Sequence, residues 1–143
     1  MTPTLALALV CTVLLIVVTA YFFMGSVPLL VLRHDTNMDA WFVRRFFGVY
    51  YATVAVIAGA TAIAYAFAGR VAFAAGAAAL VLLAAAMRRT ILPRMVALGE
   101  RIVVDGTPAI ARFRRMHVAA IAVNLAQLVA IVWTLIAVSM QMR

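Results

Sequence analysis

The sequence predicts an all-α integral membrane protein, a four-helix bundle that forms a single transmembrane domain over residues 1–143. Composition is the first reason, because hydrophobic residues make up 69% of the chain and charged residues only 11%. Soluble domains carry about 25% charged residues. Length is the second reason, since a bilayer core about 30 Å thick needs about 20 apolar residues of helix. Four uncharged runs approach or exceed that length: Met1–Leu32, Phe46–Gly69, Val71–Met87 and Val118–Met142.

The first two helices are expected over residues 4–33 and 37–68. Pro28 lies near the end of the first helix and removes a backbone donor, which predicts a kink there. The second helix is expected to begin with a capping box, because Thr36 is followed three residues later by Asp39. Its alanines at positions 58, 62 and 66 predict a stripe of small side chains that packs against the alanine-rich third helix.

The third and fourth helices are expected over residues 71–104 and 108–141. Pro93 predicts a local break in the third helix. Thr107 and Pro108 predict an N-cap followed by proline at the first helical position. At about 1.5 Å per residue the fourth helix would be roughly 50 Å long, which exceeds the bilayer core by roughly 20 Å. Both helices are therefore expected to extend into the cytoplasm as a hairpin.

The positions of the charges predict the orientation of the helices. The chain has a net charge of +8. Ten of its twelve arginines fall after the first helix or between the third and the fourth: Arg33, Arg44, Arg45, Arg88, Arg89, Arg94, Arg101, Arg112, Arg114 and Arg115. By the positive-inside rule, both termini then lie outside and the two charged connections lie in the cytoplasm. The predicted location is the inner membrane of a bacterium.

The same arginines predict the partners of the protein. A pI of 11.3 would indicate nucleic acid in a soluble protein, but next to transmembrane helices it favours anionic lipid head groups. No nucleic-acid partner is expected. The residues expected to contact head groups are Arg44, Arg45, Arg112, Arg114 and Arg115.

Several classes of activity find no support in the sequence. No Asp, Glu, Lys or Arg lies deep inside a predicted helix, and ion-coupled transporters usually carry such a residue. The chain has no GxSxG, no HExxH and no phosphate-binding glycine loop. The sequence therefore predicts neither proton-coupled export nor an enzyme.

Polar residues of the fourth helix form the candidate site. His117, Asn124 and Gln127 recur along it, and a spacing of seven residues puts the first two on one face. Tyr50, Tyr51 and Thr53 of the second helix lie at a comparable depth. Because Asn and Gln commonly form hydrogen bonds between transmembrane helices, an interhelical polar cluster is the favoured interpretation. A small ligand cavity or a lipid head-group site is the alternative.

His34 and His117 are the only histidines, and both are expected at the cytoplasmic boundary. Histidines in that position usually reach toward the interface or cap a helix. A haem held by both residues would require them to face each other around the macrocycle. With no CxxC and no further ligand motif nearby, haem or metal is the weaker alternative, and no cofactor is expected.

Two segments carry a family resemblance. Phe113-x-x-x-His117, followed seven residues later by Asn124, and the region VLRHDTNMDAWFVRRFFGVYY resemble a bacterial four-helix integral membrane family of unknown function, which is related to a small animal transmembrane protein. The resemblance covers about half of the chain. It implies a four-helix membrane fold with Arg33, Tyr50, His117 and Asn124 as family-type residues, and it implies no reaction.

Two functions are predicted from these observations. The first is a small non-enzymatic inner-membrane protein that acts as an accessory or interaction subunit, as a homo-oligomer or within a larger membrane complex. The second is a module that binds or transports a lipid or a small hydrophobic molecule through the polar face of the fourth helix. A haem or metal protein is a third, weaker alternative.

Overall fold

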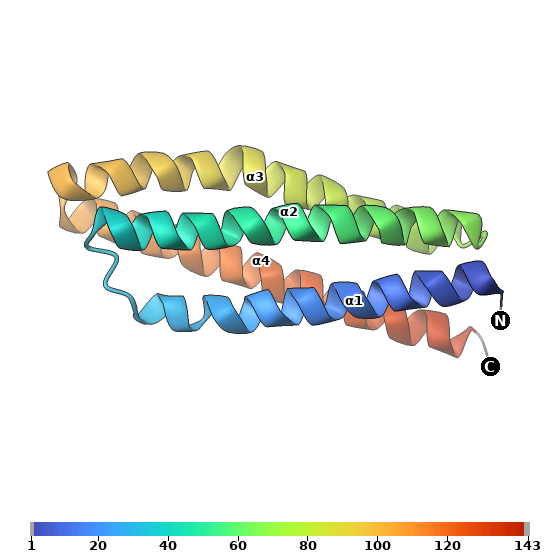
Figure 1. Cartoon of the computed structure of the whole chain (residues 1–143). Helices are drawn as coiled ribbons and strands as arrows, with labels where there is room; N and C mark the ends of the chain where they lie inside the picture. Colours follow the sequence, from blue (N-terminus) through green and yellow to red (C-terminus); the bar gives the residue numbers. More distant parts are fainter. Residues whose placement is uncertain (1, 142–143) are drawn as a thin grey trace.

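The computed structural model describes residues 2–141, with the backbone alone at residue 103, and that part of the chain is all-α without any strand. It contains four long helices and one short 3-10 helix (Figure 1). Their bounds are α1 Pro3–Ser26, η1 Pro28–Val31, α2 Asn37–Phe67, α3 Val71–Asp105 and α4 Thr107–Met140. Each of the four α-helices is long and apolar enough to cross a membrane. The predicted fold class, a four-helix bundle with membrane-spanning helices, is confirmed to that extent.

The helices run alternately up and down, so the two ends of the bundle differ (Figure 1). The α1–α2 linker and the α3–α4 turn lie together at one end, named here the linker end. The first and last described residues lie at the other end, together with the short α2–α3 turn. There the side chain of Arg70 donates a hydrogen bond of 2.8 Å to Gln141.

The first helix ends earlier than predicted. α1 stops at Ser26, and the chain continues as the 3-10 helix η1 instead of as a kinked α-helix to residue 33. Proline explains the change, because Pro28 has no N–H and its ring clashes with the carbonyl of the preceding turn. α2 begins as expected, since the Thr36 hydroxyl accepts a hydrogen bond of 3.1 Å from the Asp39 backbone N–H.

Two predictions about α3 and α4 are wrong. α3 continues through Pro93 without a break. Proline removes one backbone hydrogen bond from the helix interior, and here the turns on both sides remain helical around it. Thr107 is not an N-cap but the first residue of α4, and Gly106 precedes it with φ +58°. The Gly106 carbonyl accepts from Ala109 and Ile110 at 3.1 and 3.2 Å, so glycine backbone geometry replaces a side-chain cap.

Neighbouring helices pack in the order α1, α2, α3, α4 and back to α1, and α2–α3 is the most extensive pair. α2 and α4 are therefore diagonal partners, and their backbones have few contacts. α2 and α3 approach closely at Gly99, where an added Cβ would lie 3.1 Å from Ala40 Cβ. The predicted alanine stripe holds at Ala58, which is buried, but Ala66 is exposed because Ala64 and Tyr65 face the core there.

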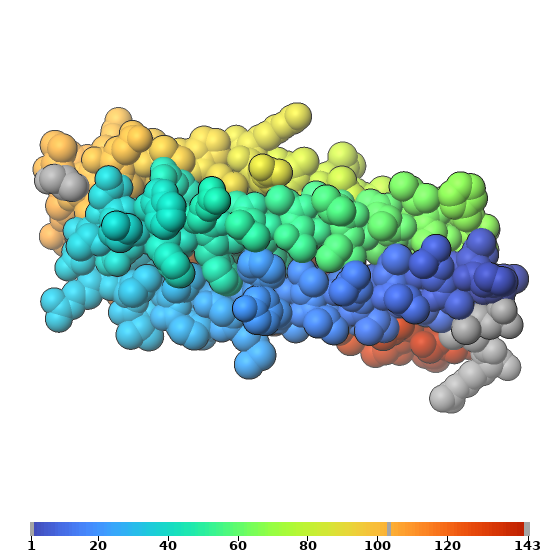
Figure 2. All heavy atoms as spheres, viewed as in Figure 1, coloured from blue at the N-terminus to red at the C-terminus, as the bar shows by residue number. Residues whose placement is uncertain are grey.

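One core runs through most of the bundle and a smaller one closes the end with the termini. Figure 2 shows an elongated molecule in which side chains of α1 and α2 meet along the visible face. The large side chains of the main core come chiefly from α2. They include Phe47, Tyr50 and Tyr51, none of which has exposed surface. α2 therefore faces both its neighbours and, across the diagonal, α4.

Candidate functional site

Buried polar side chains follow the inner faces of α1, the α1–α2 linker, α2 and α4. We name this set the polar seam. Its members are Thr12, Thr19, His34, Tyr50, Tyr51, Tyr65, His117, Asn124 and Gln127. Each is at most 3% exposed. Polar groups buried to this degree require hydrogen-bond partners. The chemistry of the seam therefore depends on which of its polar atoms have a partner and which do not.

Two tyrosines of α2 bridge the diagonal of the bundle to two amides of α4. The Tyr50 hydroxyl donates to Gln127 Oε1 at 2.8 Å, and the Tyr51 hydroxyl donates to Asn124 Oδ1 at 3.5 Å. The second bond is at the outer limit for a hydrogen bond and is the weaker one. Long phenol side chains can span the core where the two backbones do not meet. The structure thus brings together four of the six residues expected in the polar face or as its partners.

Thr53, which the sequence offered as a third partner, does not join the seam. Its hydroxyl donates to the Val49 carbonyl of the same helix at 3.0 Å. Within a helix this backbone carbonyl is the nearest available acceptor for a threonine. The hydrogen-bonding capacity of the Thr53 hydroxyl is therefore met within α2, without a contact to α4.

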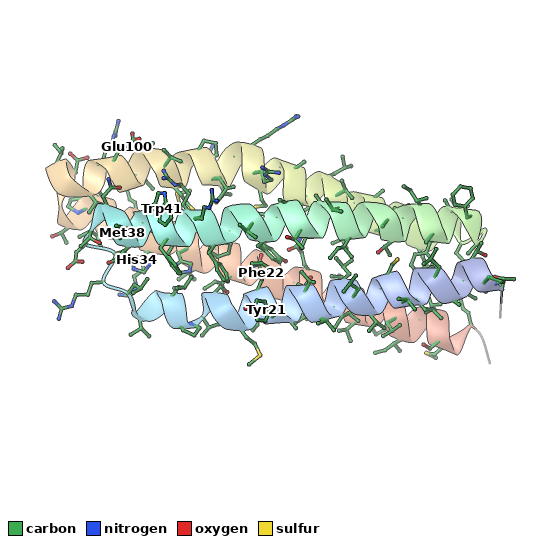
Figure 3. The ribbon with its side chains drawn as sticks, in the orientation of Figure 1. Tyr21, Phe22, His34, Met38, Trp41 and Glu100 are labelled. Atoms are coloured by element: carbon green, nitrogen blue, oxygen red, sulfur yellow. The ribbon has the colours of Figure 1, made fainter. Side chains whose placement is uncertain are left out.

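His34 and His117 lie against each other inside the bundle, so neither ring reaches outward as histidines at a membrane boundary usually do. The distance from His34 Nε2 to His117 Nδ1 is 3.1 Å, and neither residue has exposed surface. The aromatic rings of Phe113 and Phe47 surround the pair, with ring centroids 5.5 Å from His34 and 5.4 Å from His117, respectively. Figure 3 shows His34 at the linker end of the bundle. The aromatic contacts shield the histidines from water.

The backbone of His34 adopts φ +58°, the only positive φ of a described non-glycine residue. Histidine enters this region more readily than most residues, but the conformation is uncommon. It turns the linker inward so that the ring can reach α4. Backbone strain of this kind persists where the surrounding contacts enforce it, and here the contact is His117.

Burial lowers the pKa of His34 below 6.5, and Arg114 lowers it further, while the Leu32 backbone and the carboxylates of Asp39 and Asp35 oppose that shift. His34 is therefore neutral at pH 7. A neutral imidazole has one donor nitrogen and one acceptor nitrogen. A single N–H···N bond between the two rings therefore leaves one nitrogen of each ring for another partner.

Five buried polar atoms form no hydrogen bond of good geometry in the described part of the chain: Thr19 Oγ1, His34 Nδ1, His117 Nε2, Asn124 Nδ2 and Gln127 Nε2. Three of them have a partner close by, since Thr19 lies beside the Tyr50 hydroxyl, and His34 and His117 lie beside the backbone of Leu32 and Ser26, respectively. The two amide nitrogens, Asn124 Nδ2 and Gln127 Nε2, have none. All five belong to the polar seam. Each unsatisfied buried group costs about 1–3 kcal/mol, and lipid supplies no replacement. The tyrosine hydroxyls satisfy only the carbonyl side of the two amides, because a primary amide also has two N–H donors.

A cavity of about 100 Å³ lies farther along the bundle and is lined by residues from all four helices. Leu15 and Ile131 line it. They lie four residues from Thr19 and Gln127, one helical turn along the same faces. Its wall includes the hydrogen bond between the Thr12 hydroxyl and the Tyr65 hydroxyl, which is 2.9 Å long. The cavity thus continues the seam away from the linker end.

The haem alternative does not fit this geometry. Iron held by both histidines would lie between the two nitrogens together with its macrocycle, yet the nitrogens are in direct hydrogen-bonding contact. Within residues 2–141 no group of three or more His, Cys, Asp or Glu side chains is arranged to hold a metal ion.

The remaining predicted residues lie away from the seam. Arg112, Arg114 and Arg115 are exposed on α4 toward the linker end, and Arg44 and Arg45 lie on the outer side of α2 in a groove beside α3. The arginines therefore belong to the surface of the bundle, and they do not approach the amides of the core.

Sequence reasoning missed the contribution of the first helix, although a signal was present. Thr12, Thr19 and Ser26 recur every seven residues, and all three are buried. His117 and Asn124 have the same spacing on α4. A period of seven is typical of helices that pack with a shallow left-handed twist, so it would have placed these groups on facing seams.

Comparison of the chain with protein-family models, with curated proteins and with solved structures gives no match. The resemblance to the four-helix bacterial family stays a prediction. Three of its residues, Tyr50, His117 and Asn124, belong to the polar seam, while Arg33 precedes His34 in the linker.

Proposed function

We propose that this chain is a non-enzymatic integral membrane protein that binds one small amphipathic molecule in its core. The observation that carries the proposal is the pair of amide N–H groups without a partner in the polar seam, Asn124 Nδ2 and Gln127 Nε2. Left alone, each would destabilise the bundle by about 1–3 kcal/mol. A bound molecule that accepts hydrogen bonds would remove that cost, and the seam would then serve as its recognition site.

The chemistry of the free atoms defines the class of ligand. Asn124 Nδ2 and Gln127 Nε2 can only donate, and the Thr19 hydroxyl can donate or accept. The matching group on the ligand is a neutral acceptor such as a carbonyl or ether oxygen. A neutral group is favoured because the seam contains no arginine, lysine or carboxylate. Amides, phenols and hydroxyls of this kind hold and orient a ligand, which supports binding without catalysis.

The cavity one helical turn beyond Thr19 and Gln127 limits the size of the apolar part. Its volume is about 100 Å³, whereas an engineered protein cavity of about 150 Å³ accommodates benzene. Pockets for drug-sized ligands are about 300–1,000 Å³. The ligand that fits this closed bundle is therefore no larger than one ring or a short alkyl chain with its polar end at the amides.

The proposal also includes the membrane in which the protein lies and the side to which each end of the bundle points. The positive-inside rule favours a linker end in the cytoplasm and both termini outside, because ten of the twelve arginines belong to that end or to its flanks. α3 and α4 would then extend beyond the membrane on the cytoplasmic side, in the inner membrane of a bacterium. Membership of the four-helix bacterial family that the sequence resembles is likewise part of the proposal.

The direct test is retention of a small molecule through purification in mild detergent. Solvent extraction and mass spectrometry of the wild type should reveal one small neutral compound in stoichiometric amount. Asn124→Leu and Gln127→Leu should each lower its content by about tenfold, the effect of losing about 1.4 kcal/mol of binding. Thr53→Val is the matched control, because that hydroxyl bonds only within its own helix. Equal content in all four proteins would exclude the seam as the site.

An accessory or interaction subunit is the second candidate, and α3 favours it. α3 buries the smallest share of its apolar span. Its outward face carries small residues at helical spacing, namely Ala72, Gly76, Ala79 and Ala86, all exposed. Small residues let transmembrane helices approach closely, so a second copy or another membrane protein could pack there. Cross-linking in native membranes tests this, and a strictly monomeric protein without partners contradicts it.

A further inference from the structure

A second feature lies outside the polar seam, on the surface between α2 and α3 toward the linker end. It is an open groove of about 680 Å³. Three arginines line it, Arg44 and Arg45 from α2 and Arg88 from α3, together with Trp41. Its floor is apolar and includes Gly48, Ala52, Leu92 and Val96. Figure 3 shows Trp41 on this part of α2, beside α3.

The register of the two helices places the arginines at opposite ends of the groove. An added Cβ at Gly48 would lie 3.8 Å from Leu92, and one at Gly99 would lie 3.1 Å from Ala40. Because the helices are antiparallel, Arg88 lies near the level of Ala52. Arg44 is eight residues from Ala52, which is about 12 Å along the helix. An apolar floor thus separates two basic ends.

The arginines are available to a ligand. None of the side-chain hydrogen bonds in the described chain involves Arg44, Arg45 or Arg88, and no carboxylate lines this groove. Glu100 lines a neighbouring hollow that shares Trp41 and Arg44. Glu100 therefore belongs to the neighbouring hollow, and the charged residues that line the groove itself are all basic.

The groove begins at Arg44 and Arg45, at the boundary between head groups and acyl chains, and continues about 10 Å deeper to Arg88. Arg45 immediately precedes the uncharged run Phe46–Gly69, and Arg88 immediately follows the uncharged run Val71–Met87. Tryptophan is enriched at that boundary, and Trp41 lies one turn before Arg45. A guanidinium binds phosphate oxygens through two parallel N–H donors, and the floor between the basic ends offers surface to an acyl chain.

We infer that this groove binds one anionic phospholipid, with its phosphate reached by the long side chains of Arg44 and Arg45 from one end and of Arg88 from the other, and with an acyl chain that continues past Ala52 toward the α2–α3 turn. Basic pockets between transmembrane helices are known to hold such head groups. This inference is independent of the proposed function, because the groove lies on the outer face of α2 and α3 and the seam lies among α1, α2 and α4.

The test uses purified full-length protein, stripped of lipid in detergent and titrated with phosphatidylglycerol or phosphatidylcholine of the same acyl chains. Native mass spectrometry counts the bound lipids. The wild type should bind one phosphatidylglycerol in preference to phosphatidylcholine. The triple variant Arg44→Gln/Arg45→Gln/Arg88→Gln should lose this affinity by about tenfold or more, since each arginine near an anionic lipid contributes roughly a fivefold gain.

The control removes the same charge from exposed positions of α3 that do not line the groove: Arg89→Gln/Arg94→Gln/Arg101→Gln. It should retain phosphatidylglycerol binding within about twofold. Equal losses in the two triple variants would show a general effect of charge and would overturn the groove as a site. Equal binding of phosphatidylcholine by the wild type would overturn it as well.

A third variant keeps every charge and fills the groove. Gly48→Phe places a ring where only Leu92 lies within 4 Å of the new Cβ, so the helices need not separate. It should weaken phosphatidylglycerol binding, while Ala60→Phe on an exposed part of α2 should not. If the arginine variant fails to fold, this pair decides: unchanged binding in Gly48→Phe contradicts the inference.

Discussion

His34, in the linker between α1 and α2, and His117, in α4, form a direct contact of 3.1 Å between Nε2 and Nδ1 across 83 residues of sequence. Neither ring has exposed surface. The contact fixes the inward turn of the linker and closes the core at the linker end. Most of the other side-chain hydrogen bonds between helices of the described chain lie farther along the polar seam. The histidine pair therefore forms the end of a row of buried polar groups that extends into the bundle.

Acid should destabilise the protein through His34. Burial, reinforced by Arg114, lowers its pKa below 6.5 against the opposing effect of the Leu32 backbone and of Asp39 and Asp35. At acidic pH the folded protein then binds fewer protons than the unfolded chain. The contribution of His34 to the free energy of unfolding is therefore fully present above about pH 6.5 and decreases as the pH falls below that value. The melting temperature in detergent should be lower at pH 5 than at pH 7.5.

His34→Gln supplies the reference for that experiment, because it retains a polar side chain that does not titrate. Its melting temperature should change less between the two pH values than that of the wild type. A wild-type protein that becomes more stable in acid would show that the histidine is not held neutral in the folded state.

Backbone strain at His34 predicts that glycine at this position gives a more stable protein than alanine. His34→Ala and His34→Gly both remove the ring and its bond to His117. Alanine pays about 1–2 kcal/mol for a left-handed conformation that glycine adopts freely. With φ +58° at this position, His34→Gly should be the more stable variant by chemical denaturation. The opposite order would mean that the linker relaxes to a negative φ when the ring is lost.

The diagonal bridge between α2 and α4 should contribute measurably to stability. Tyr50→Phe removes the hydroxyl that donates to Gln127 at 2.8 Å and leaves the amide with one partner fewer. Hydrogen bonds between transmembrane helices contribute on average about 0.6 kcal/mol, with a maximum of about 1.7 kcal/mol, and a loss in that range is expected. Tyr21→Phe is the control, since Tyr21 is 72% exposed. Identical unfolding of the two variants would exclude a contribution from the bridge.

Close approach of α2 and α3 depends on glycine. Gly99→Leu cannot be accommodated without moving the helices, because its Cβ alone would lie 3.1 Å from Ala40 Cβ. Overpacking of this kind typically costs about 1–3 kcal/mol. Gly76→Leu is the matched change on the same helix, where an added Cβ meets nothing within 4 Å. Thermal unfolding should separate the two, and equal melting temperatures would contradict tight packing at Gly99.

The fold class could be predicted because it depends on local properties. Long uncharged runs and the scarcity of charge produce helices that are long and apolar enough to cross a membrane, whatever their partners. The helix ends were less predictable, since they depend on tertiary context. The exposed Pro93 leaves α3 intact, whereas Pro28 ends α1. At Gly106 a positive φ replaces the side-chain cap expected from Thr107.

The polar cluster was predictable in part for a similar reason. Asn124 and Gln127 are amides inside an apolar run, and Tyr50 and Tyr51 are the phenols at their depth, so pairing them needs only a rough alignment of two helices. His34 could not be placed that way. It lies in a linker without periodicity, and its burial depends on one unusual backbone conformation. The groove of Arg44, Arg45 and Arg88 likewise depends on the register of α2 and α3.

The most direct test of a ligand in the polar seam is a density map of the protein purified in native lipid, at a resolution that shows ordered water. Continuous non-protein density, larger than a water molecule, should lie within hydrogen-bonding distance of Asn124 Nδ2 and Gln127 Nε2 and extend into the cavity beside Leu15 and Ile131. A seam that holds only isolated waters at those nitrogens, with an empty cavity, would contradict the proposal.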